Sequence, residues 1–304
     1  MELNYTIIQQ KKQNQYWNIS KANDALRVMG PHCDGNSFGV ATMQTKDKRA
    51  VGVDISIRFD PQALGKEVTI TAYDMAVMDA VYTLYVYHNL QVSDTTILQI
   101  MYGKHDLDIT PEKVKQLHNS IYKLSQITIC VECSEEFRAR RIVNKDEDVT
   151  YQGNLLPLES DHDDYVITEI SPTYQYAQQI GQYATVSSEI LQAGAVQNSA
   201  EILLLRRYLI KRIVAMRNQH NRMFSKRIAL EWWDHKQKRY SGLLPHLGYD
   251  PEKNPVPRKK KSTLCQAIRA ILTGLQKSSY IAGYVEVRQE RKIIGYEVQL
   301  KGGG

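Results

Sequence analysis

The chain has 304 residues and a net charge of +6, and 42% of its residues are hydrophobic. This length accommodates two ordinary domains, and the composition is that of a globular protein. No apolar run approaches the length of a membrane span, and the first residues, Met1–Asn4, lack the basic-then-apolar order of a signal peptide. We therefore expect a cytoplasmic protein without a membrane partner.

The charge is distributed unevenly along the chain. Residues 201–304 hold 22 Lys and Arg against 8 Asp and Glu, a net charge of +14, whereas residues 1–200 hold 17 against 25, a net charge of −8. A basic third joined to an acidic remainder is typical of a protein that binds a polyanion through one domain. The basic residues are spread over several segments, which disfavours a single amphipathic helix on a membrane surface.

The cysteines do not indicate a metal site. Cys130 and Cys133 form the one CxxC pair in the sequence, and a structural zinc ion usually needs two such pairs. The pair lies in a strand-like run rather than at a helix start, where the pKa of a redox thiol would be lowered. We expect two ordinary strand residues, no metal and no cofactor.

Residues 1–67 are predicted to be an N-terminal extension that contains β-structure. Strand-like runs occur at Tyr5–Gln9 and Gly52–Arg58, and Ser20 is a candidate helix start. The glycines of Gly35–Gly39 are not followed by the Lys-Ser/Thr of a nucleotide-binding loop.

Three helices are predicted next, over Ala72–His88, over Asp94–Met101 and from Thr110 onward. Thr71, Ser93 and the Thr110-Pro111-Glu112 run are good helix-starting signals. A strand over Ile127–Cys133 and a second strand near Tyr165–Ile170 are expected to form a hairpin. The long loop or wing of this hairpin would be partly acidic, with Asp146, Glu147, Asp148, Glu159, Asp161, Asp163 and Asp164.

The third of these helices has an apolar stripe and a polar face. The polar face is a candidate DNA-binding surface and consists of Lys113, Gln116, Ser120 and Lys123. Because acidic residues surround this domain, dimerisation is the alternative role for it.

The second half repeats the pattern of helices followed by a hairpin, after a boundary at Gly194–Ser199. A long helix is predicted over Ala200–Asn218, and a further helix over Lys226–His235, capped by Ser225 and carrying Trp232 and Trp233. The long helix carries basic residues that either contact phosphate or form a solvated face, namely Arg206, Arg207, Lys211 and Arg212.

The C-terminal stretch carries the main functional prediction. A helix over Ser262–Lys277 follows a basic run and precedes two strands, Ile281–Val287 and Ile293–Leu300, joined by a charged tip. The helix has an apolar stripe formed by Leu264, Ile268, Ile271 and Leu275, and a polar face formed by Ser262, Gln266, Arg269 and Thr273. A solvated polar face is the alternative interpretation of the second set.

We assign provisional roles to the side chains of this stretch. Gln266 and Arg269 have the chemistry to read base edges. The cations expected to contact DNA phosphates are Arg258, Lys259, Lys260, Lys261, Arg288, Arg291 and Lys292.

The order of these elements resembles that of the replication initiator proteins of plasmids and related mobile elements. The resemblance is carried by Thr71–Tyr82, Arg206–Leu209, Phe224–Ile228 and the C-terminal helix and hairpin, and it covers roughly residues 69 to 300. It implies two winged-helix domains that bind repeated double-stranded DNA sites at an origin, a homodimer that represses its own gene, and recruitment of the host initiator and helicase.

The expected fold is therefore α+β, with two tandem winged helix-turn-helix domains and the N-terminal extension. We divide the chain into residues 1–67, a first winged helix at 68–194 for dimerisation or DNA binding, a DNA-binding winged helix at 195–300, and a tail at 301–304.

Three other functions are considered. A transcriptional repressor would need the same residues as an initiator, and a scaffold would use the Trp232-Trp233 segment to bind a partner. A metal-dependent nicking initiator would need closely spaced histidines, and the sequence holds no His-x-His pair; His162 lies between Asp161 and Asp163. We therefore expect no enzymatic activity.

Overall fold

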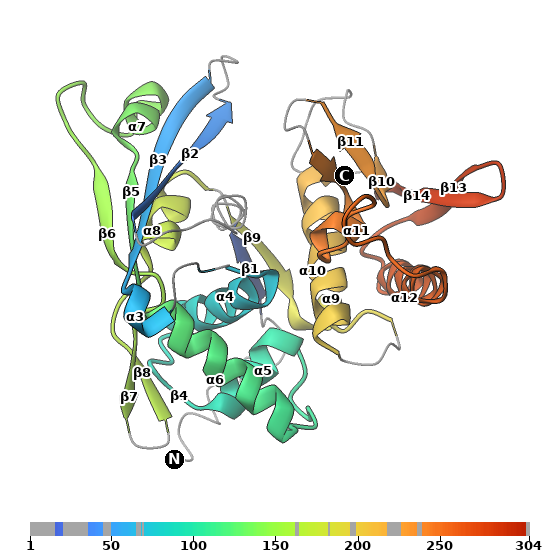
Figure 1. The fold of residues 1–304 in the computed structure, drawn as a ribbon, viewed down its shortest axis with the longest axis horizontal. Helices are drawn as coiled ribbons and strands as arrows, with labels where there is room; N and C mark the ends of the chain where they lie inside the picture. The colour runs from blue at the N-terminus through green and yellow to red at the C-terminus, as the bar shows by residue number, and fades with distance from the viewer. Residues whose placement is uncertain are drawn as a thin grey trace. The chain divides into compact units, whose positions relative to one another are not determined.

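The structure is a computed structural model that describes residues 16–20, 36–44, 50–64, 68, 70–161, 164–181, 183–194, 199–217, 226–235 and 239–301. The expected strand at Tyr5–Gln9 and the expected cap at Ser225 lie outside these residues. The fold class is α+β, as predicted (Figure 1). The chain forms two compact units, one of residues 1–101 and 105–185 and the other of residues 102–104 and 186–304.

A four-stranded antiparallel sheet runs through unit 1, in the order β2 (Asn36–Gln44), β3 (Ala50–Phe59), β5 (Ile127–Glu132) and β6 (Thr150–Asn154). Alternate residues of β3 and β5 are buried on one face, as the period of a strand requires, and include Ile55, Ile57, Ile127, Ile129 and Val131. The sheet thus joins residues of the predicted extension to the helices that follow them. The β1 strand (Tyr16–Ser20) pairs with β9 (Tyr183–Ser187), and the residues of the helix expected to begin at Ser20 lie outside the described residues.

The three predicted helices of unit 1 are confirmed. They are α4 (Ala72–Val86), α5 (Asp94–Tyr102) and α6 (Pro111–Ser125), and the shorter helices of this unit are α3 (Pro61–Leu64), α7 (Ser134–Arg140) and α8 (Pro172–Gln179). Thr71 caps α4 in a capping box, in which the backbone N–H of Asp74 donates to Thr71 Oγ1 over 3.2 Å.

The predicted hairpin between β5 and the Tyr165 region is wrong. A separate sheet has the order β4 (Gln91–Val92), β8 (Asp164–Ile167) and β7 (Leu158–Asp161), and β7 and β8 form the hairpin. The intervening residues instead form α7 and β6, so the acids Asp146–Asp148 belong to the connection between α7 and β6 and not to a wing. Asp163 lies outside the described residues.

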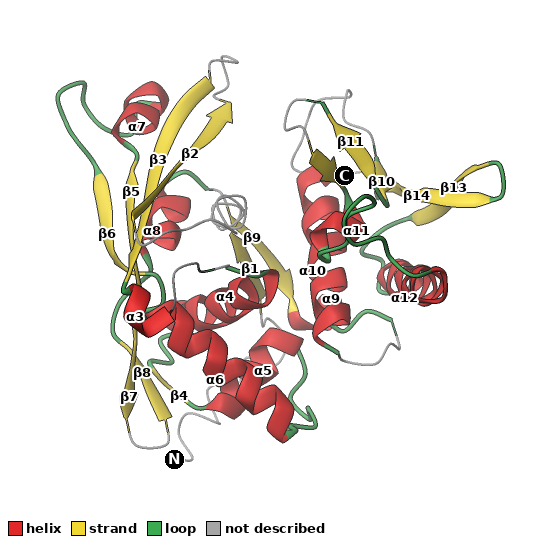
Figure 2. Ribbon diagram, in the orientation of Figure 1, coloured by secondary structure: helices red, strands yellow, loops and turns green. Residues whose placement is uncertain are grey.

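Unit 2 is built around two long helices. It contains α9 (Ser188–Leu191), α10 (Ala200–Arg217), β10 (Arg227–Ala229), α11 (Leu243–His246), α12 (Arg258–Lys277), β13 (Gly283–Gln289) and β14 (Lys292–Gln299). Its three-stranded sheet has the order β10-β14-β13, and Figure 2 shows the β13–β14 hairpin extending away from α10.

The two units share one order of elements. Each has a helix, a short strand, two more helices and a hairpin, and in each the short strand pairs with the last strand of the hairpin. The repeat noted in the sequence is therefore also a repeat of topology, interrupted in unit 1 by β5, α7 and β6 and in unit 2 by β11 (Trp232–Asp234) and β12 (Arg239–Ser241).

The predicted helix over Lys226–His235 is wrong. This segment contains β10 and β11 (Trp232–Asp234), and β11 pairs with β12 (Arg239–Ser241). The register places Trp233 opposite Tyr240, with their ring centroids 5.0 Å apart. Aromatic residues favour strands when they find such a cross-strand partner, and this partner lies just beyond the segment predicted as a helix.

Candidate nucleic-acid interface

Helix α12 is held in unit 2 by the apolar stripe that the sequence predicts. Leu264, Ile268, Ile271 and Leu275 are buried. The helix begins at Arg258, after Pro257 as the N-cap residue, so the basic run forms the first turn of the helix itself. The opposite side of the helix is then free to carry the polar residues.

The four basic residues of this first turn are not equivalent. Arg258 and Lys259 are exposed, and no ion pair is formed by either within the described part of the chain. Lys260 forms an ion pair with Glu201 of α10, and Lys261 Nζ lies 2.7 Å from Glu231 Oε1. Two of the four basic residues in this turn therefore form ion pairs with glutamates of unit 2, and the other two are exposed without an ion pair to the described residues.

The charges of the first turn are unfavourable for the isolated helix. No acidic residue lies in this turn, and no side chain caps it. A helix N-terminus carries partial positive charge, so cations there are destabilising and a bound anion is stabilising. The arrangement therefore favours binding of phosphate at this end of α12.

The predicted polar face of α12 is divided by the hairpin. Ser262 and Gln266 are exposed. Further along, Arg269 Nε donates to Glu286 Oε1 of β13 over 2.5 Å, and Thr273 Oγ1 lies 3.0 Å from the hydroxyl oxygen of Tyr284. The first half of this face is open, and the second half is lined by β13, so Thr273 is a structural contact.

The tip of the β13–β14 hairpin is basic and exposed. Arg291 and Lys292 are exposed, with no ion pair to any residue that the structure describes, and Glu290 between the strands has a positive φ of 55°. Arg288 donates from Nε and Nη2 to Glu286 Oε2, over 3.1 and 2.6 Å. Sequence reasoning missed Glu286 and Tyr284, although their alternation on β13 places both on one side of that strand.

The candidate DNA-binding face of α6 in unit 1 is largely occupied by internal contacts. Ser120 is buried, and its Oγ donates to Asp74 Oδ1 over 2.6 Å, while Lys123 Nζ lies 2.5 Å from Asp74 Oδ2. Lys113 Nζ donates to the Asp108 carbonyl, and Gln116 is exposed. Both side chains satisfy the buried carboxylate of Asp74, which supports a structural role for Ser120 and Lys123.

The two arginines at the middle of α10 are also not on the surface. Arg206 and Arg207 are buried, and Arg206 Nη2 donates to the carbonyl of Gly194 over 3.1 Å. Burial lowers the pKa of Arg206 from its ordinary value. Both earlier interpretations, a phosphate contact and a solvated face, are therefore wrong for this pair.

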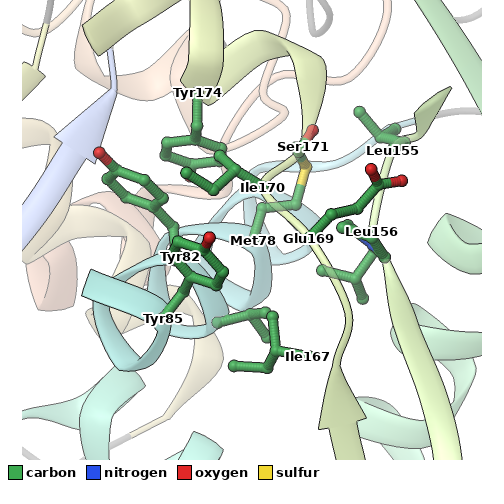
Figure 3. A pocket seen from close by; sticks show the side chains of 12 residues that line it. Met78, Tyr82, Tyr85, Leu155, Leu156, Ile167, Glu169, Ile170, Ser171 and Tyr174 are labelled. Atoms are coloured by element: carbon green, nitrogen blue, oxygen red, sulfur yellow. The ribbon is translucent and has the colours of Figure 1, made fainter. Parts of the chain in front are cut away.

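Within the described residues, no group of three or more His, Cys, Asp and Glu side chains is placed to hold a metal ion, and His162 lies outside those residues. A small pocket in unit 1 is lined mainly by apolar and aromatic side chains, including Met78, Tyr82 and Tyr174 (Figure 3). Its one carboxylate is Glu169. None of the helices in the described part of the chain is both long enough and apolar enough to span a bilayer.

Comparisons with known proteins give similarity of structure only. No family model matches the chain, and no curated protein matches it. A crystal structure of domains 2 and 3 of RctB is similar with a TM-score of 0.44 and 14% identity, covering 92% of this chain and 97% of that one. A second crystal structure of RctB domains 2 and 3 has a TM-score of 0.43 and 11% identity over the same shares.

Proposed function

We propose that the protein binds specific sequences of duplex DNA through α12 and the β13–β14 hairpin of unit 2. The element order and the strand pairing that the two units share support a winged helix-turn-helix interpretation of both. In this arrangement the third helix enters the major groove and the hairpin lies along the adjacent backbone.

One observation carries this proposal. The side chains exposed on α12 and on the hairpin tip are mainly cations and hydrogen-bonding groups, with Glu290 as the acidic exception at the tip; they include Arg258, Lys259, Ser262, Gln266, Arg291 and Lys292. The cations would hold phosphates, and the polar groups of the helix would face base edges. The net charge of +14 over residues 201–304 would attract DNA to the same unit.

Within this class we propose a replication initiator of a plasmid or mobile element. The tandem units support it, because two winged helices in one chain can read two parts of one repeated origin site. Such a protein would work in the cytoplasm as a homodimer with the host initiator and helicase, and it would act by binding and not by catalysis.

The binding proposal is tested by the salt dependence of affinity for duplex DNA. Lys259→Ala should weaken binding to all sequences about equally and reduce the slope of log K against log salt by about 1, because one phosphate contact is lost. Lys277→Ala is the matched control, since Lys277 is an exposed cation at the opposite end of α12. Equal slopes for the wild type and the Lys259 variant would contradict the placement of phosphate at this end of the helix.

A replication role is separated from a purely repressive one by transformation. The gene and its flanking repeats should sustain a plasmid that lacks any other origin. If transformants never arise although the protein protects the flanking DNA from cleavage, a transcriptional repressor is the better assignment.

A further inference from the structure

Glu286 of β13 holds two arginines that come from different elements of unit 2. Its Oε1 accepts from Arg269 Nε of α12 over 2.5 Å, and its Oε2 accepts from Arg288 Nη2 of the hairpin over 2.6 Å. The carboxylate is mostly covered, with 20% of its side chain exposed, against 41% for Arg269 and 52% for Arg288. One carboxylate between two guanidinium groups leaves a net positive charge, so the cluster remains attractive to DNA.

Arg269 contacts Glu286 through Nε, so its two terminal nitrogens can still donate hydrogen bonds. Its Nε is bound to Glu286, and its two terminal nitrogens have no hydrogen-bond partner among the residues that the structure describes. A guanidinium group reads guanine by donating two parallel hydrogen bonds to O6 and N7, and the two terminal nitrogens form such a fork. Contact through Nε therefore fixes the plane of the group without using the donors that recognition needs.

Glu286 lies on a strand whose residues are packed against β14 and α12. The backbone of Glu286 lies opposite Tyr296, which is buried, and the neighbouring residue Tyr284 contacts Thr273 of α12 through its hydroxyl group. The register of β13 against β14 shifts between Val287 and Arg288, which turns the hairpin just beyond the carboxylate. The hydrogen bond from Arg288, and then that from Arg269, holds the pKa of Glu286 below its ordinary value, so the carboxylate is charged at neutral pH.

We propose that Glu286 is a positioning residue that fixes the guanidinium group of Arg269 for bidentate recognition of one guanine in the major groove. This inference rests on the proposed function, since it requires α12 to lie in that groove. A freely rotating arginine would bind phosphate or base without preference, whereas an arginine held through Nε has one orientation and one partner.

The experiment measures discrimination at single base pairs. The full chain is used to select its preferred duplex from a random pool, and dissociation constants are then measured for every single-base-pair variant of that duplex. Glu286→Ala should reduce discrimination at one G·C pair by about tenfold, which is the loss of one oriented bidentate contact. Arg269→Ala should reduce discrimination at the same pair, and adding Glu286→Ala to it should change nothing further.

Glu290→Gln is the matched control, because it removes the same charge from the same hairpin at an exposed position that lies beyond the two arginines. It should change affinity for all duplexes alike. Equal discrimination in the wild type and Glu286→Ala, with salt-dependent binding retained in both, would overturn the positioning role alone. Absence of salt-dependent duplex binding by the wild type would overturn the proposed function, and the positioning role with it.

Discussion

At the scale of single residues, Asp74 shows how a polar helix face becomes part of a protein interior. The backbone N–H of Thr71 donates to Asp74 Oδ2 over 2.6 Å, and Ser120 and Lys123 complete the hydrogen bonding of the same carboxylate. Burial of a carboxylate without such partners would lower the free energy of unfolding by several kcal/mol. The side chains that this carboxylate recruits are therefore structural, whatever their chemistry suggests.

Ser120→Ala should lower the free energy of unfolding by about 1–3 kcal/mol, because the mutation leaves one oxygen of a buried carboxylate without its donor. DNA affinity should not change. Urea denaturation and a DNA titration check the two outcomes. Gln116→Ala, on the exposed side of the same helix, should alter stability by less than about 0.5 kcal/mol. A loss of DNA affinity in Ser120→Ala without a loss of stability would restore Ser120 as a DNA contact.

At the scale of elements, α12 is fixed by a close approach of backbone to backbone. A Cβ atom built on Gly274 of α12 would lie 2.2 Å from the backbone nitrogen of Gly194. Gly194 itself has a φ of 84°, and its carbonyl accepts the hydrogen bond from Arg206 of α10. The buried arginine thus holds the segment against which the proposed recognition helix packs, which gives Arg206 a structural role.

Gly274→Ala should destabilise unit 2 by more than about 2 kcal/mol, because the new methyl group would collide with backbone that cannot rotate away. Helix propensity alone predicts the opposite, a gain of about 1 kcal/mol. Chemical denaturation followed by circular dichroism distinguishes the two.

Gly248→Ala provides the comparison for this mutation. Gly248 has a φ of 91° and no atom within 4 Å of an added Cβ, so its cost is backbone strain alone. We expect that cost to be about 1–2 kcal/mol. A Gly274 variant as stable as the wild type would show that α12 is held by its apolar stripe without the glycine contact.

At the scale of the whole molecule, both cores contain tyrosines whose hydroxyl groups are shielded from water. Burial raises the pKa of Tyr102, Tyr176, Tyr280 and Tyr296 above the ordinary value of 10.0. Burial, followed by the nearby carboxylate of Asp94, raises the pKa of Tyr165 to about 12. A raised pKa means that the folded state keeps a proton that the unfolded state loses first.

The free energy of unfolding should therefore be insensitive to these groups below their unfolded pKa of about 10, and it should fall as the pH rises from there towards 12. Urea unfolding at a series of alkaline pH values measures this decrease. Tyr165→Phe should make the decrease shallower, whereas Tyr122→Phe, at an exposed position, should leave it unaltered. A stability that rises through this range would contradict the burial of the phenol groups.

An element could be predicted from the sequence where the residues that determine it lie within the element itself. The helices α4, α5, α6 and α12 are set by signals within their own segments, such as the capping box at Thr71 and the apolar stripe of α12. The structure confirms all four, and α12 begins at Arg258, before the predicted start at Ser262. The strand at Trp232–Asp234 depends on pairing with β12, which lies just beyond the predicted helix. The pairing of β5 with β3 and β6 depends on partners many residues away. Local patterns do not contain that information, and the hairpin in unit 1 was assigned to the wrong strand as a result.

The sequence by itself determined the α+β class, the positions of α4, α5, α6 and α10, the apolar stripe of α12 and the accumulation of positive charge near the C-terminus. These depend on composition and on periodicity along the chain. The tertiary structure alone decided which polar side chains reach solvent: Arg258 and Gln266 do, whereas Lys261, Ser120 and Arg206 are turned to internal partners. A side chain is withdrawn from the surface by a carboxylate or carbonyl brought from elsewhere in the chain, and only folding supplies that partner.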